Sequence, residues 1–321
     1  KVSMHWKFIP TVSSGRGESY TQRGCYFRFR RTLVGKKFEL FELNVIRSDG
    51  LRHTLGKGDW GVESLTGVDF PEIEIFSEPR GYGNGDIVTG KRKKSRLITF
   101  TASFRASDDK YESERRNVLG FYNANYTYQL EVTYLGNTLL AKECELVAAN
   151  YPSANIYDSP DLSISLMSPY PDLFADSKET TSFSSVTPMW HWTRYYAPGG
   201  GKLAFGEITK TDTKVINYLG SEPAPIAITI KSTGYVPGID IEMGDLKTGV
   251  KTVLNASDVL FIDCDKRTVK KNGKDVPYSD FDARDLMQMV LGYGDNQIKI
   301  SKDGNTAFTA EVSFVGRYGG V

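Results

Sequence analysis

The sequence lacks an excess of charge of either sign. Its 40 lysine and arginine residues almost cancel its 39 aspartate and glutamate residues, so the formal net charge is +1. Proteins that bind nucleic acid through a broad surface carry a strong basic excess, and none is present here. A membrane span is not expected either, because no segment approaches the ~18 consecutive apolar residues that a spanning helix needs.

Cysteine and histidine are scarce. The three cysteines are Cys25, Cys144 and Cys264. Their odd number, wide separation and lack of CxxC spacing argue against a disulfide framework and a cysteine zinc site, as in a protein that folds in a reducing cytosol. The three histidines are His5, His53 and His191. Neither HExxH nor GxSxG occurs, so the sequence predicts no enzyme activity, no metal and no cofactor. A Ser-His-Asp triad assembled by the fold remains an alternative.

One glycine-rich segment resembles a phosphate-binding loop and then departs from it. Residues 85–91 fit the first seven positions of that motif, but Arg92 replaces the Ser or Thr that would bind magnesium. The motif should also open a helix, whereas Arg96 leads into an alternating strand. We therefore expect no nucleotide site and interpret Gly81, Gly83 and Gly85 as the flexible tip of a hairpin.

Alternation of apolar and polar residues is the dominant pattern, and it predicts a mainly β protein. Four segments each place apolar side chains on one strand face; these are Ile98 to Phe104, Tyr126 to Tyr134, Ile226 to Ile230, and Phe308 to Phe314. Asn272-Gly273 is typical of a type I′ hairpin turn. A helix is predicted over 109–123, where Tyr111, Val118, Leu119 and Tyr122 share one face. Residues 282–291 are ambiguous, and we favour a strand there.

The segment 176–188 is polar, rich in Ser and Thr, and ends in a proline, as linkers often do. We therefore expect two domains over 1–177 and 186–321, joined by a linker over 178–185. Residues 1–24 are interpreted as an arm ahead of the first strand.

Two surface candidates stand out. The basic run Lys91, Arg92, Lys93 and Lys94 is interpreted as a solvated loop, a nucleic-acid contact or a subunit contact. The aromatic cluster Trp190, Trp192, Tyr195 and Tyr196 could form a sugar-binding platform, or it could serve core or interface packing. Asp263 and Asp265 could ligate a cation, but a strand-end turn that accepts backbone hydrogen bonds is favoured.

The order of strands and turns resembles that of the distal tail proteins of siphophages. In the C-terminal half, the resemblance is carried by residues 215–230, 258–263, 268–274, 294–300 and 312–321. In the N-terminal half, it is carried by residues 38–46, 74–75, 85–86, 96–100 (an arginine followed by a strand), the helix at 109–123 and residues 161–171. Residues 1–24 and 178–214 have no clear counterpart in that family.

This resemblance implies an N-terminal β-barrel-like, tail-tube-like domain with one helix, followed by a C-terminal galectin-like β-sandwich. It implies a structural subunit of a phage or prophage, assembled in the host cytoplasm and located at the virion tail tip. A hexameric ring would join the tail tube protein to the tail-associated lysin or fibre hub, and the outer domains could hold receptor-binding or baseplate proteins. The alternative is a carbohydrate-binding β-sandwich module with an appended β domain.

Overall fold

A computed structural model describes residues 41–106, 108–151, 161–188, 206–304 and 306–321. All of them belong to one compact unit, Phe38–Val321. Strands dominate this unit, so the predicted fold class, mainly β with few helices, is confirmed. Among the residues described by the structure, no helix has the length and apolar character of a membrane span.

The N-terminal half is an antiparallel sheet in the order β3-β6-β9-β8-β7-β1-β2. These strands are β1 (Phe41–Arg47), β2 (Arg52–Leu55), β3 (Trp60–Thr66), β6 (Arg96–Phe104), β7 (Thr127–Tyr134), β8 (Asn137–Asn150) and β9 (Leu162–Ser168). Their alternating apolar residues form one hydrophobic cluster, in which Ile98, Phe100 and Leu130 are fully buried. Helix α1 (Asp108–Phe121) adds Val118 and Tyr122, which directly follows it, to this cluster, as the sequence predicts. Phe121 also belongs to the cluster, whereas Leu119, predicted on the same face, is 52% exposed.

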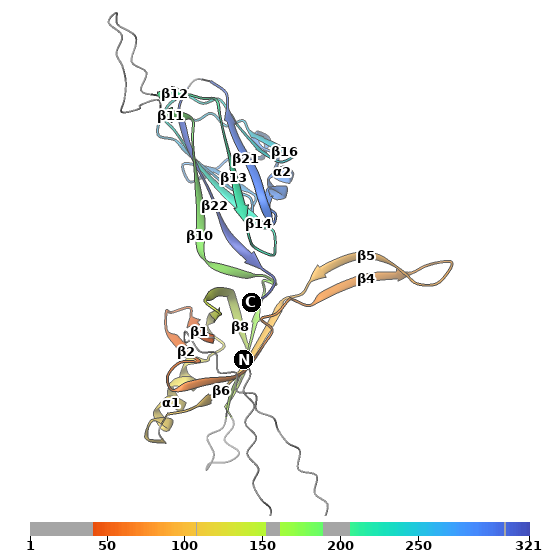
Figure 1. The fold of residues 1–321 in the computed structure, drawn as a ribbon, viewed down its shortest axis with the longest axis vertical. Coiled ribbons are helices and arrows are strands. Elements are labelled where there is room, and N and C mark those ends of the chain that lie inside the picture. Colours follow the sequence, from red (N-terminus) through yellow and green to blue (C-terminus); the bar gives the residue numbers. More distant parts are fainter. Residues whose placement is uncertain (1–40, 107, 152–160, 189–205, 305) are drawn as a thin grey trace, which may run out of the picture. The chain divides into compact units, whose positions relative to one another are not determined.

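A separate two-stranded hairpin joins β3 to β6. It consists of β4 (Ile73–Pro79) and β5 (Asp86–Lys93), which pair only with each other among the described strands. Figure 1 shows these two strands side by side as a narrow ribbon. Gly83 and Gly85 near its tip have positive φ angles, as a tight connection requires, so the predicted hairpin tip is confirmed.

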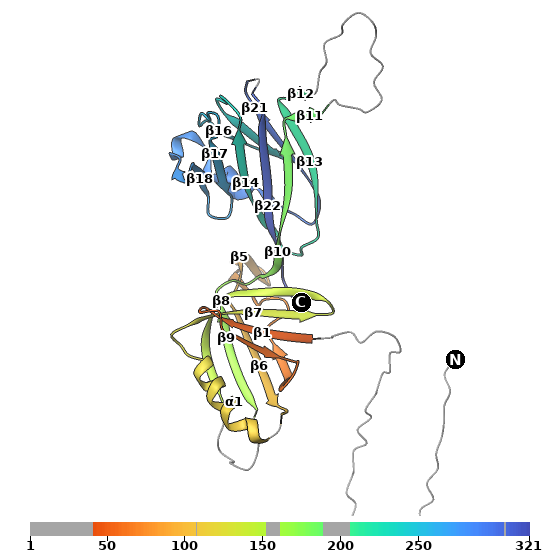
Figure 2. The same cartoon turned by 90° about the vertical axis from the view of Figure 1, so that its left-hand side faces the viewer.

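The C-terminal half contains two sheets that share one core. The first has the order β19-β18-β17-β14-β22-β10, with β20 also paired to β14, and the second has the order β13-β21-β15-β16. The bounds are β10 (Leu173–Ser184), β13 (Thr211–Tyr218), β14 (Ala224–Ser232), β15 (Ile239–Met243), β16 (Leu246–Val250), β17 (Val259–Asp263), β18 (Thr268–Lys271), β19 (Lys274–Asp275), β20 (Val290–Leu291), β21 (Gly294–Lys302) and β22 (Phe308–Tyr318). Ile228 and Val312 from the first sheet and Ile241 and Ile300 from the second belong to one buried cluster, as in a β-sandwich (Figure 2).

Short elements complete this half. They are the strand pair β11 (Val186–Pro188) and β12 (Gly206–Ile208), the 3-10 turn η1 (Tyr278–Asp280) and helix α2 (Ala283–Gln288). The strand that we favour from the sequence for 282–291 is wrong over most of its length. Asp282 caps α2 by accepting a hydrogen bond from the Arg284 backbone N–H, at 2.8 Å, and a strand forms only at β20.

Residues 178–184 form part of β10 and pair with residues of β22, so this stretch is a strand where the sequence suggests a linker. Its polar composition has a physical reason, because most of its side chains are exposed. The same strand pairs with β8 at Phe174 and Ala175, and it therefore connects the sheets of the two halves. The division into two domains stays a prediction.

Candidate functional site

The β4–β5 hairpin exposes apolar side chains to an unusual degree. The exposed fraction is between 44% and 56% for Ile73, Ile75, Phe76, Ile87 and Val88. The strand register sets Ile73 opposite Lys93 and Ile75 opposite Lys91, so aliphatic and basic side chains share one face. An isolated two-stranded hairpin is only marginally stable in water, and exposed apolar patches of this kind commonly mark interaction surfaces.

The basic run lies at the base of this hairpin and not in a loop. Lys91, Arg92 and Lys93 end strand β5, and Lys94 follows it directly. Arg92 forms an ion pair with Glu74 on the paired strand, at 2.6 Å, and its guanidinium lies over the Phe76 ring. The loop assignment is wrong because this segment pairs with β4, whose carboxylates come some twenty residues earlier in the sequence.

Lys93 and Lys94 also form ion pairs with carboxylates from other segments. Lys93 contacts Asp172 at 2.8 Å and Glu222 at 2.5 Å. Burial lowers the pKa of Lys93, but the hydrogen bonds that its ammonium donates to both carboxylates outweigh burial, and the net pKa is raised. Lys94 pairs with Glu72 at 2.9 Å, and this hydrogen bond raises its pKa.

Within the described part of the chain, Lys91 is the member of the run that has no ion pair or side-chain hydrogen bond. It is also exposed. Of the four candidate residues, Lys91 is therefore the one available to an outside partner, and the subunit-contact role of the run stays a prediction.

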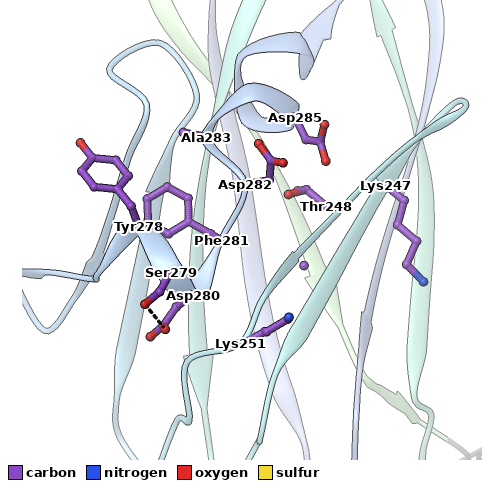
Figure 3. A pocket seen from close by; sticks show the side chains of 11 residues that line it. Lys247, Thr248, Lys251, Tyr278, Ser279, Asp280, Phe281, Asp282, Ala283 and Asp285 are labelled. Atoms are coloured by element: carbon purple, nitrogen blue, oxygen red, sulfur yellow. Dashed lines mark hydrogen bonds between the residues drawn. The ribbon is translucent and has the colours of Figure 1, made fainter.

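A hollow of about 510 Å³ lies beside α2 in the C-terminal half (Figure 3). Lys247 and Lys251 line it together with Asp280, Asp282 and Asp285. Two of the carboxylates already have partners: Asp282 caps α2, and Asp280 accepts hydrogen bonds from Ser279 and Thr252. The hollow therefore offers side chains of both charges, two of which are already engaged in hydrogen bonds.

The pair Asp263 and Asp265 forms a turn, as favoured from the sequence. The Asp263 carboxylate accepts hydrogen bonds from the backbone N–H groups of Asp265 and Lys266, at 3.1 and 3.0 Å. Asp265 pairs with Arg317 at 3.0 Å. Among the residues that the structure describes, no group of three or more His, Cys, Asp or Glu side chains is arranged to hold a metal ion.

The described thiols are buried, and the described imidazole is partly buried. Cys144 and Cys264 are free, and burial raises the pKa of each to about 12, so they stay protonated and are poor nucleophiles at neutral pH. His53 shares a hydrogen bond with Tyr122 Oη, at 2.9 Å, and packs edge-on against Trp60 and Phe121. The sequence does not predict this aromatic environment, because only the tertiary fold brings the three segments together.

The candidate aromatic surface, Trp190, Trp192, Tyr195 and Tyr196, lies outside the described residues. The candidate residues that the structure does describe all belong to the β4–β5 hairpin or follow it directly.

Comparisons with known proteins agree with the fold. Residues 219–318 match the family model described as siphovirus-type tail component, C-terminal domain. No curated protein matches the chain. Among solved structures, the chain is similar to SPP1 Dit, described as a paradigm of the hub adsorption apparatus in phages that infect Gram-positive bacteria. The TM-score is 0.56 at 10% identity, over 86% of this chain and 98% of that one.

A chain of the phage P2 baseplate in its activated conformation with Ca also matches, with a TM-score of 0.43 at 10% identity, over 88% of this chain and all of that one. The resemblance predicted from the order of strands and turns is thus confirmed: residues 219–318 match a siphovirus-type tail component domain, and the described fold is similar to that of a phage distal tail protein.

Proposed function

We propose that this chain is a structural hub subunit of a phage tail tip. The observation that carries the proposal is the family match over 219–318, within the half that contains the β-sandwich. The similarity to SPP1 Dit supports it, because the likeness spans nearly the whole of that hub protein.

In this role, copies of the chain form a six-fold ring through their N-terminal halves. The ring joins the tail tube protein to the tail-associated lysin or fibre hub, and the C-terminal sandwiches hold baseplate or receptor-binding proteins. Two separate hydrophobic clusters support such a division of labour, since each half can keep its own core while its surface binds a different partner. The boundary that we propose lies within β10, whose first residues pair with β8 and whose later residues pair with β22.

The chemistry of the described residues supports a role in assembly over one in catalysis. The two described cysteines are protonated and buried. The exposed apolar hairpin, in contrast, is typical of a surface that binds another protein.

Immunogold electron microscopy of virions tests the proposal. Antibodies against residues 219–318 should label the end of the tail distal to the capsid, at one site per particle. Label along the tail tube, on the capsid or absent from purified virions would overturn the proposed location.

A further inference from the structure

Besides the hairpin, the N-terminal half has a second surface without an obvious partner, which is the outward face of strands β6 and β9. Residues on these strands alternate between the buried cluster and the outside. The outward side chains are Leu97, Thr99, Thr101 and Ser103 on β6, and Ser163, Ser165 and Met167 on β9. We call this surface the β6–β9 face.

No side chain of the β6–β9 face is charged, although a quarter of the residues in the whole chain are charged. Leu97 and Met167 lie directly opposite each other and are 51% and 42% exposed. The solvent face of an antiparallel sheet ordinarily carries polar and charged residues, and depletion of charge is typical of the centre of a protein interface. The β6–β9 face therefore lacks the charge of an ordinary solvent face, and at Leu97 and Met167 it exposes an apolar pair that another protein can cover.

Carboxylates border this face at both ends. Glu145 on β8 lies opposite Met167 and is exposed, and within the described ranges it has no ion pair or side-chain hydrogen bond. At the other end of the face, Glu63 pairs with Arg105 at 3.1 Å and accepts a hydrogen bond from Ser103, and the exposed Asp161 directly precedes β9. Glu145 is the carboxylate that lies beside the exposed apolar pair Leu97 and Met167.

The hairpin carries the complementary features. Its exposed Ile73 and Ile75 provide apolar contact area on one face, and Lys91 is an unpaired cation beside Ile75 on that same face. The lengths also agree: strands of seven or eight residues span roughly 25 Å, and β6, with nine residues, spans about 30 Å. One chain thus has an arm that exposes Ile75 beside the cation Lys91, and a flat face that exposes Leu97 and Met167 beside the anion Glu145.

We propose that the β4–β5 hairpin of one copy lies on the β6–β9 face of the next copy, with Lys91 paired to Glu145. The inference rests on the proposed function, because it names the contact by which the ring would close. The two surfaces differ from each other, so the contact is heterologous, and repeating it by a fixed rotation gives a ring and not a two-fold dimer.

Charge reversal at this contact provides the test, with native mass spectrometry and mass photometry of the full chain as readout. Lys91→Glu and Glu145→Lys should each raise the concentration needed for half-assembly on the order of tenfold, since an attraction becomes a repulsion. The double variant should assemble like the natural chain. Lys274→Glu, the same change at an exposed strand position in the C-terminal half, should leave assembly unaltered.

Mixing the two single variants gives a sharper result. In an alternating ring, the glutamate introduced by Lys91→Glu in one chain meets the lysine introduced by Glu145→Lys in the next. At the following contact, the natural Lys91 of the second variant meets the natural Glu145 of the first. An equimolar mixture should therefore assemble where each variant alone does not, and the rings should contain both chains in equal number.

The outcomes separate the two proposals. If the natural chain stays monomeric, the proposed hub function fails. If the natural chain assembles and the single variants assemble equally well, the hub function stands and the hairpin contact is overturned. If the variants lower the melting temperature of the single chain without changing assembly, these surfaces are covered within one chain, which also overturns the inference.

Discussion

At the scale of single residues, Arg96 holds together segments that are far apart in the sequence. It is 3% exposed, and its guanidinium donates hydrogen bonds to the carbonyl oxygens of Gly67, Asp69, Pro171 and Gly319. The arginine that precedes a strand, which helps to carry the family resemblance, is thus explained by the five donors of a planar guanidinium.

Arg96→Lys should lower the free energy of unfolding by about 3 kcal/mol. An ammonium group cannot reach all four carbonyls, and each buried carbonyl left without a donor costs about 1–3 kcal/mol. Urea unfolding of the two proteins measures the difference. Arg92→Lys is the matched control, since Arg92 is exposed and its pair with Glu74 should change stability by at most about 0.5 kcal/mol. Equal effects of the two changes would contradict this role for Arg96.

His53 should make the N-terminal half sensitive to acid. Burial among aromatic rings lowers the pKa of His53 from 6.5 to about 4. Between pH 4 and 6.5, the unfolded chain binds more protons than the folded chain does. The stabilising contribution of neutral His53 is therefore complete above about pH 6.5 and is lost as the pH falls toward 4. The loss amounts to roughly 3 kcal/mol.

Chemical unfolding at pH 7.5, 6 and 5 tests this, with His53→Gln as the comparison. The glutamine variant lacks the titrating group, so its stability should fall less steeply with acidification. If both proteins lose stability in parallel, His53 does not carry the effect.

At the scale of secondary structure, the turn between β18 and β19 shows how local sequence determines a hairpin. Asn272 and Gly273 have φ angles of 49° and 79°, and Lys271 pairs with Lys274 across the turn, as the Asn-Gly pair predicts. Gly273→Ala should cost about 1 kcal/mol, because an L-residue is strained at positive φ. Gly292→Ala, at a glycine with open space and no positive φ, should cost less in the same thermal unfolding assay. A reversed order would contradict the turn assignment.

The elements that could be predicted from the sequence are those whose pattern of apolar and polar residues lies within one short segment. Ile98, Phe100 and Ala102 alternate with polar residues and are fully buried, and the same holds for the run from Ile226 to Ile230. The helix near 109–123 could also be predicted, because its apolar residues recur with helical spacing.

The elements that could not be predicted depend on partners distant in the sequence. The polar stretch 178–184 is a strand because β22 pairs with it, and its composition reflects exposure. From the sequence alone, the basic run is interpreted as a loop, because the carboxylates that pair with Arg92, Lys93 and Lys94 lie in other segments. These carboxylates are Glu72, Glu74, Asp172 and Glu222. The β6–β9 face shows its lack of charge only once the two strands are known to lie side by side.

At the scale of the whole molecule, the chain combines two hydrophobic cores with an exposed hairpin and an uncharged sheet face. Apolar side chains of the hairpin that stay exposed to water do not stabilise a monomer, whereas a ring subunit can bury them against its neighbour. The family match and the similarity to SPP1 Dit are consistent with this account of the chain as a repeated structural part.

The number of copies in the assembled protein tests this account most directly. Native mass spectrometry of the purified chain, over a range of concentrations, should show a closed species of six copies. Partly assembled species should be rare, because the contact that closes the ring forms within one assembly and recruits no further copy. Rings of the same size should appear by negative-stain electron microscopy. A chain that remains monomeric at every concentration, or that forms only two-fold dimers, would contradict the account.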